Sequence, residues 1–87
     1  MKYLLQVCKW FDDINGNTYH NVLIKVPDGR ILRSGFKYGY GSQYIVSALD
    51  TLKENGIEAT RQDLEVEYET QTPLESKCRD FRGVLIV

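Results

Sequence analysis

The sequence predicts an α+β domain, an antiparallel sheet of four to five strands with one amphipathic helix packed on one face. Three observations predict this class. Two alternating stretches flank the turn-forming pair Asn15-Gly16, a third follows Pro27-Asp28-Gly29, and residues 43–55 repeat apolar positions with helical period. With 87 residues the chain has room for one domain, residues 1–87, and one modest core.

The first three strands are expected at residues 2–11, 18–26 and 30–36. The first is apolar on both faces, which is typical of a strand inside a sheet. In the third, Leu32 and Phe36 are expected to point inward. Short turns join all three strands, so they should form an N-terminal three-stranded antiparallel meander.

The helix is predicted to begin at Gln43, with Ser42 as a side-chain cap for its first turn, and to end before Asn55-Gly56. Its apolar stripe consists of Ile45, Ala48, Leu49 and Leu52. Such a stripe would cover one face of the meander.

The last third of the chain predicts one half-buried strand at residues 64–69, then a polar loop with a helical turn near 75–78, and an apolar strand at 83–87. The expected outer face of the first of these strands is a row of carboxylates, Glu65, Glu67 and Glu69. This row could meet a basic partner, or it could keep the strand from aggregating.

Composition excludes several classes of function. The net charge of −1 supplies no basic field, so nucleic acid is an unlikely partner. Cys8 and Cys78 match neither a metal spacing nor a secreted disulfide framework, and we interpret them as reduced thiols of a cytoplasmic protein. No segment approaches the roughly 20 apolar residues of a membrane span, so no membrane association is expected.

The glycine-tyrosine segment, residues 36–44, is the most specific local signal. Its glycines and the helix start could present backbone N–H groups to an anion, while its tyrosines could stack on a base or pack on a partner. The alternative is a strand-to-helix corner whose tyrosines cover the core. The candidate binding residues are Tyr38, Gly39, Tyr40, Gly41, Ser42 and Tyr44, with Trp10, Arg33 and Lys37 nearby.

Other chemistry has little support in the sequence. The basic residues Arg30, Arg33 and Lys37 could form a local anion site or a scattered solvated face. The single His20 has no nucleophile and orienting group that the sequence can place beside it, which favours a structural role. We therefore expect no catalytic residues, no metal site, no cofactor and no enzymatic activity.

A resemblance to a known group of proteins indicates where this chain acts. The run Asn15-Gly16-Asn17-Thr18-Tyr19, followed by residues 36–44 leading into Ser47-Ala48-Leu49, resembles small proteins encoded by tailed bacteriophages, mostly of unassigned function. The likeness covers residues 2–56, and its specific part is the Tyr-Gly-Tyr-Gly stretch. It implies a phage accessory protein that acts in the cytoplasm of the infected host cell, and it assigns no residue a role.

The leading functional hypothesis is a non-enzymatic phage-type binding protein, an inhibitor of a host defence or regulatory protein. The alternative is a nucleotide or anion receptor that sequesters a small signalling molecule at residues 39–42. A homodimer is compatible with the small core and the apolar residues 84–87.

Overall fold

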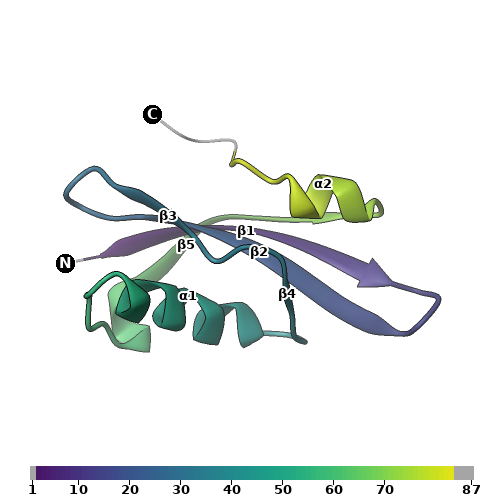
Figure 1. The fold of residues 1–87 in the computed structure, drawn as a ribbon, viewed down its shortest axis with the longest axis horizontal. Helices are drawn as coiled ribbons and strands as arrows, with labels where there is room; N and C mark the ends of the chain where they lie inside the picture. Colours follow the sequence, from purple (N-terminus) through teal and green to yellow (C-terminus); the bar gives the residue numbers. More distant parts are fainter. Residues whose placement is uncertain (1, 84–87) are drawn as a thin grey trace.

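The computed structural model describes residues 2–83 and confirms the α+β class. A five-stranded sheet lies between a main helix on one face and a short helix on the other (Figure 1). The elements are β1 (Tyr3–Asp12), β2 (Asn17–Lys25), β3 (Ile31–Arg33), β4 (Lys37–Tyr38), α1 (Gln43–Glu54), the 3₁₀ turn η1 (Arg61–Asp63), β5 (Leu64–Thr72) and α2 (Glu75–Arg79).

The strand order is β3-β2-β1-β5, with β4 also paired to β2. The β1–β2, β2–β3 and β2–β4 pairs are antiparallel, whereas β1 and β5 run parallel. The central position predicted for the first strand is confirmed, since β1 lies between β2 and β5. The sheet is therefore mostly, not wholly, antiparallel.

The core lies between the sheet and α1. Ala48 and Leu52 of the predicted helical stripe are buried, and Ile45 packs against the same cluster. The buried core residues are Leu5, Val7, Val22, Ile24, Val26, Ala48 and Leu52. Because the first four alternate on β1 and β2, they share the face that α1 covers.

The third strand is shorter than predicted. β3 ends at Arg33, because Gly35 takes a φ of 79° and the chain leaves the ladder before rejoining β2 as β4. Ser34 bridges the break, since its backbone N donates to Val22 O at 3.0 Å and its Oγ accepts from Val22 N at 3.0 Å. The prediction that Phe36 points into the core is wrong, because its ring stacks on Tyr19.

The predicted row of three carboxylates is also wrong. The β1–β5 register shifts between Leu5 and Gln6, where Glu67 forms a bulge and takes no partner in the ladder. Glu67 accepts a hydrogen bond from Gln6 Nε2 at 3.0 Å and pairs with Lys25, while Glu69 pairs with Lys9. Gln6 and Lys9 lie on opposite faces of β1, so these glutamates do too.

The short α2 confirms the helical turn expected near residues 75–78 and covers the second face of the sheet (Figure 1). This second helix was not part of the predicted one-helix packing. The apolar strand predicted at residues 83–87 lies, except for Gly83, outside the described residues.

Candidate functional site

The turn between β1 and β2 is held rigid by Asp12. Residues 13–16 form the loop, and Gly16 closes it with a φ of 71° and a hydrogen bond from its N to Asp12 O at 2.7 Å. The Asp12 carboxylate accepts from Ile14 N and Asn15 N at 3.1 and 3.3 Å, and from Asn15 Nδ2 at 2.8 Å. The Asn15 side-chain bond is the main cause that lowers the pKa of Asp12.

Aromatic rings form a continuous row beside this turn. Trp10 and Tyr19 lie opposite each other across the hairpin, with centroids 5.4 Å apart. Tyr19 stacks on Phe36 at 5.0 Å and meets the edge of Tyr38 at 5.4 Å, and Tyr38 meets Tyr40 at 5.7 Å. Each contact is in the geometry that aromatic pairs favour, so the row is preorganised.

Tyr40 connects the row back to the turn. Its hydroxyl donates to Gly16 O at 2.9 Å. A hydrogen bond with Tyr40 raises the pKa of Tyr38 above its ordinary value of 10.0. The two rings are about half exposed and fixed at the same end of the molecule.

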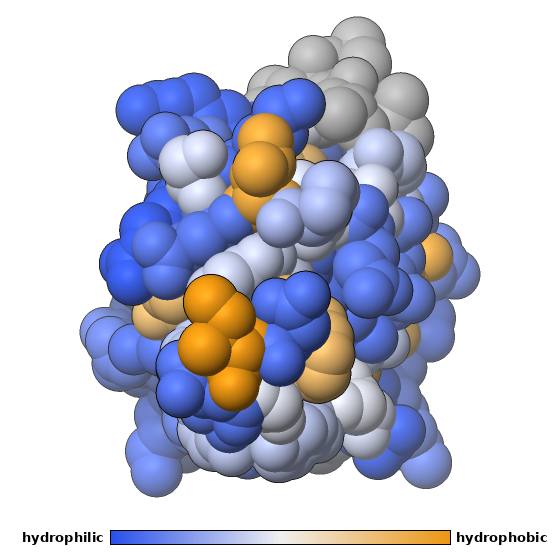
Figure 2. Space-filling view, turned by 90° about the vertical axis from the view of Figure 1, so that its right-hand side faces the viewer, coloured by the Kyte–Doolittle hydropathy of each residue, from blue (hydrophilic) through white to orange (hydrophobic). Residues whose placement is uncertain are grey.

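Large exposed apolar side chains concentrate at this end, which faces the viewer in Figure 2. Ile14, at the tip of the turn, is 90% exposed. The figure shows hydrophobic groups separated by hydrophilic ones. We name this surface the hairpin end, and its exposed apolar residues are Phe11, Ile14, Tyr38, Tyr40 and Leu74.

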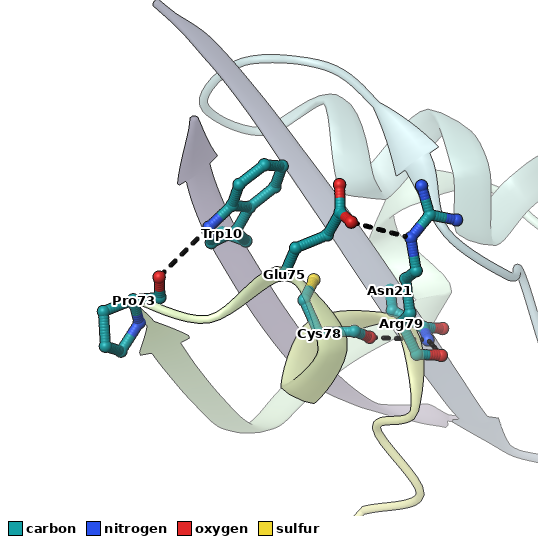
Figure 3. A network of polar contacts seen from close by, with 6 residues as sticks. All are labelled: Trp10, Asn21, Pro73, Glu75, Cys78 and Arg79. Carbon is teal, nitrogen blue, oxygen red and sulfur yellow. Dashed lines mark hydrogen bonds and ion pairs between the residues drawn. The ribbon is translucent and has the colours of Figure 1, made fainter. Parts of the chain in front are cut away.

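The β5–α2 connection forms one wall of the hairpin end. Trp10 Nε1 donates to Pro73 O at 3.3 Å (Figure 3). A hollow of about 510 Å³ lies between the turn and this connection, with Trp10, Phe11, Ile14 and Pro73 in its lining. On the other side of the row, the Arg79 guanidinium lies 4.1 Å from the centroid of Phe36.

The glycine-tyrosine segment is a strand-to-helix corner with Gly39 buried at its centre. Gly39 N donates to Thr18 O at 2.9 Å and is therefore not free for an anion. A Cβ at this position would collide with the Gln43 side chain and lie 3.2 Å from the His20 ring. Only glycine fits this close approach of the corner to β2 and α1.

The helix start differs from its prediction in one respect. α1 begins at Gln43 as expected, but Ser42 makes no side-chain capping bond. Gly41 precedes it with a φ of 53°. Tyr44 does not join the hairpin end, because it packs against the α1-covered core and the Lys9 Nζ lies 5.0 Å from its ring centroid.

Arg30 and Arg33 do not gather with Lys37 beside the helix start. Arg30 pairs with Asp28 at 2.8 Å. Lys37 lies opposite His20, on the other side of β4 from Tyr38. Arg33 lines a separate hollow of about 250 Å³, together with Asn21, Gly35, Arg79, Asp80, Phe81 and Arg82.

His20 is a buried structural residue. It is 1% exposed, its Nε2 lies 2.7 Å from Ser47 Oγ, and its ring also bonds the backbone at Gly39. Burial lowers its pKa below 6.5, and the charges of Lys9 and Lys37 lower it further. His20 thus joins β2, the glycine corner and α1 as a neutral imidazole.

This pKa predicts a specific pH dependence of stability. The unfolded chain takes up a proton as pH falls through 6.5, whereas folded His20 resists protonation, so the free energy of unfolding should fall between about pH 7 and pH 5. Urea unfolding across this range measures the slope. The carboxyl groups with lowered pKa, such as Asp12, change the free energy of unfolding only at lower pH. His20→Gln should flatten the slope, and an unchanged slope in that variant would contradict the assignment.

Of the residues predicted for the site, the structure brings Trp10, Tyr38 and Tyr40 together. Sequence reasoning missed several residues that surround them. These are Phe11, Ile14, Tyr19, Phe36, Leu74 and Arg79. Tyr19 could have been found from the sequence. A hairpin whose loop consists of residues 13–16 pairs Tyr19 with Trp10.

Comparison of the chain with protein-family models, curated proteins and solved structures gives no match. Among residues 2–83, no group of three or more His, Cys, Asp or Glu side chains is placed to hold a metal ion. Over the same residues, no helix has the length and apolar character needed to cross a membrane.

Proposed function

We propose that this chain is a non-enzymatic protein-binding domain and that the hairpin end is its contact surface. The observation that carries the proposal is the concentration of exposed apolar side chains around a rigid turn, with Ile14 90% exposed at its tip. Tyr, Trp and Phe are enriched at protein interfaces, and exposed apolar groups clustered on one surface mark interaction sites.

Preorganisation supports binding by this surface. Asp12 fixes the turn, and Tyr40 is hydrogen-bonded to it. The rings of Trp10, Tyr19 and Phe36 support one another. A surface that is already ordered loses less side-chain entropy on association, so more of the apolar burial appears as affinity.

The partner follows from the resemblance to small tailed-phage proteins. We infer a bacterial host protein with a defence or regulatory role, which the chain inhibits by covering it. Support for the alternative, a receptor for a small nucleotide at residues 39–42, is weaker. Gly39 N is engaged, and the aliphatic side chains of Ile14 and Leu74 offer little to a phosphate.

The test compares co-purification of host proteins from bacterial lysate by the tagged wild-type chain and three variants. Ile14→Asp and Tyr38→Ala should weaken capture of a partner by roughly tenfold or more, as hot-spot truncations do. Val46→Asp is the matched control, because Val46 is 46% exposed on α1 and is not one of the residues that define the hairpin end. It should leave capture unchanged.

A partner that binds all four chains equally would refute the assignment of the surface. Thermal stabilisation of the purified chain by nucleotides, without any captured protein, would instead favour the receptor hypothesis.

A further inference from the structure

The fold brings together the two cysteines, which lie 70 positions apart in the chain. Cys8 on β1 is 3% exposed, and Cys78 on α2 is 0% exposed. The Cys78 thiol donates a hydrogen bond to the backbone oxygen of Cys8, with Cys78 Sγ 3.4 Å from Cys8 O. Both are free cysteines in contact across the α2-covered face of the sheet.

Neighbouring contacts hold this arrangement in place. Asn21 Nδ2 on β2 donates to the carbonyl oxygens of Cys78 and Arg79 at 2.9 and 3.0 Å (Figure 3). These bonds fix the backbone of α2 at the level of Cys78. The sulfur of Cys78 therefore stays next to Cys8 while the rest of the short helix lies at the surface.

A hollow borders the pair on the side of Cys8. A hollow of about 660 Å³ lies between β5 and α2, and Cys8 forms part of its lining together with Tyr68, Ser76 and Phe81. The hollow is open to solvent and much larger than a peroxide molecule. Cys8, and not Cys78, lines this hollow, so Cys8 lies on the solvent side of the pair.

We propose that Cys8 and Cys78 are a site of oxidative modification, at which hydrogen peroxide produces a disulfide bond that joins β1 to α2. The inference does not depend on the proposed function.

The chemistry balances with peroxide as the only oxidant. The thiolate of Cys8 attacks one peroxide oxygen, the O–O bond breaks, and water leaves after taking the thiol proton, which yields a sulfenic acid. The sulfur of Cys78 then attacks the sulfenic sulfur, the S–O bond breaks, and the hydroxyl leaves as a second water with the Cys78 proton. Two thiols are oxidised, and one peroxide is reduced to two waters.

The environment assigns the order of these steps. Burial raises the pKa of both thiols, that of Cys78 to about 12, whereas a hydrogen bond from Cys78 partly offsets the effect at Cys8. Cys8 therefore ionises first and is the thiol that attacks the peroxide. Because both thiol pKa values are raised, little thiolate is present near pH 7 and oxidation is slow, so it requires prolonged exposure to peroxide. The rate of oxidation should increase as pH rises.

The test treats the purified full chain with hydrogen peroxide and follows free thiols and mass. We expect loss of both thiols with a mass lower by two hydrogens, and one cross-linked peptide pair containing Cys8 and Cys78. The melting temperature should rise by roughly 10 °C, because the bond closes a long loop in the unfolded chain, and dithiothreitol should reverse the rise.

Cys8→Ser and Cys78→Ser are the matched variants, and neither should show the reversible rise in melting temperature. A second measurement does not depend on the rate of oxidation by peroxide. In it, the wild-type chain is equilibrated with reduced and oxidised glutathione. Formation of the intramolecular disulfide supports the proposal. Mixed glutathione disulfides at equilibrium, linked dimers, or sulfinic acid in place of the cross-link would overturn it.

Discussion

Replacing Leu52 by alanine is expected to lower the free energy of unfolding by about 2–5 kcal/mol. Leu52 is 0% exposed and lies in the cluster that joins α1 to β1 and β2. Truncation removes buried methyl groups and leaves a cavity that the surrounding strands cannot fill without distorting the sheet. Urea unfolding monitored by circular dichroism measures the loss.

Val46→Ala is the control on the same helix. Val46 is about half exposed, and alanine has the higher helix propensity, so this variant should stay within about 0.5 kcal/mol of wild type. Equal losses in the two variants would mean that burial against the sheet does not hold α1 in place.

Asn21→Ala should release α2 from the sheet and cost about 1–3 kcal/mol. The substitution removes both hydrogen bonds from Asn21 Nδ2 and leaves the carbonyl oxygens of Cys78 and Arg79 without that donor. The loss should be local. Hydrogen exchange in residues 75–79 should accelerate and the Cys78 thiol should react faster with a thiol reagent, while the amides of β1 and β2 stay protected.

Asn55→Ala provides the comparison, because Asn55 Nδ2 makes one hydrogen bond to Thr51 O at the end of α1. It should cost less than Asn21→Ala and leave the reactivity of Cys78 unchanged. If Asn21→Ala leaves thiol reactivity and exchange in α2 at wild-type values, then Asn21 is not what holds the helix.

Short-range sequence patterns predicted the strands, turns and helix that are determined by neighbouring residues. The apolar faces of β1, the turn around Asn15-Gly16 and the stripe of α1 are each encoded within a few residues. The structure confirms them except at Leu49, the one residue of the predicted stripe that lies outside the core cluster. The helix begins at Gln43 without a Ser42 cap, so the apolar stripe and the glycine corner are sufficient to define its start.

Non-local contacts account for what the sequence did not predict. The bulge at Glu67 depends on the register between β5 and β1, which alternation within β5 cannot show. Phe36 appeared to be a core residue because it follows Leu32 at an even spacing, but the break at Gly35 turns it toward Tyr19. The sequence could thus identify individual tyrosines of the hairpin end, but it could not predict the row of rings that they form with Trp10 and Phe36.

The parallel pairing of β1 with β5 has a consequence for the order of assembly. The β1–β2 hairpin closes over a short loop, whereas Gln6 and Glu67, which bond across β1 and β5, are 61 positions apart. Closing the longer loop costs more chain entropy, and β5 leaves the ribosome long after β1. One edge of β1 therefore stays open in the nascent chain, while the hairpin that carries the proposed contact surface can already form.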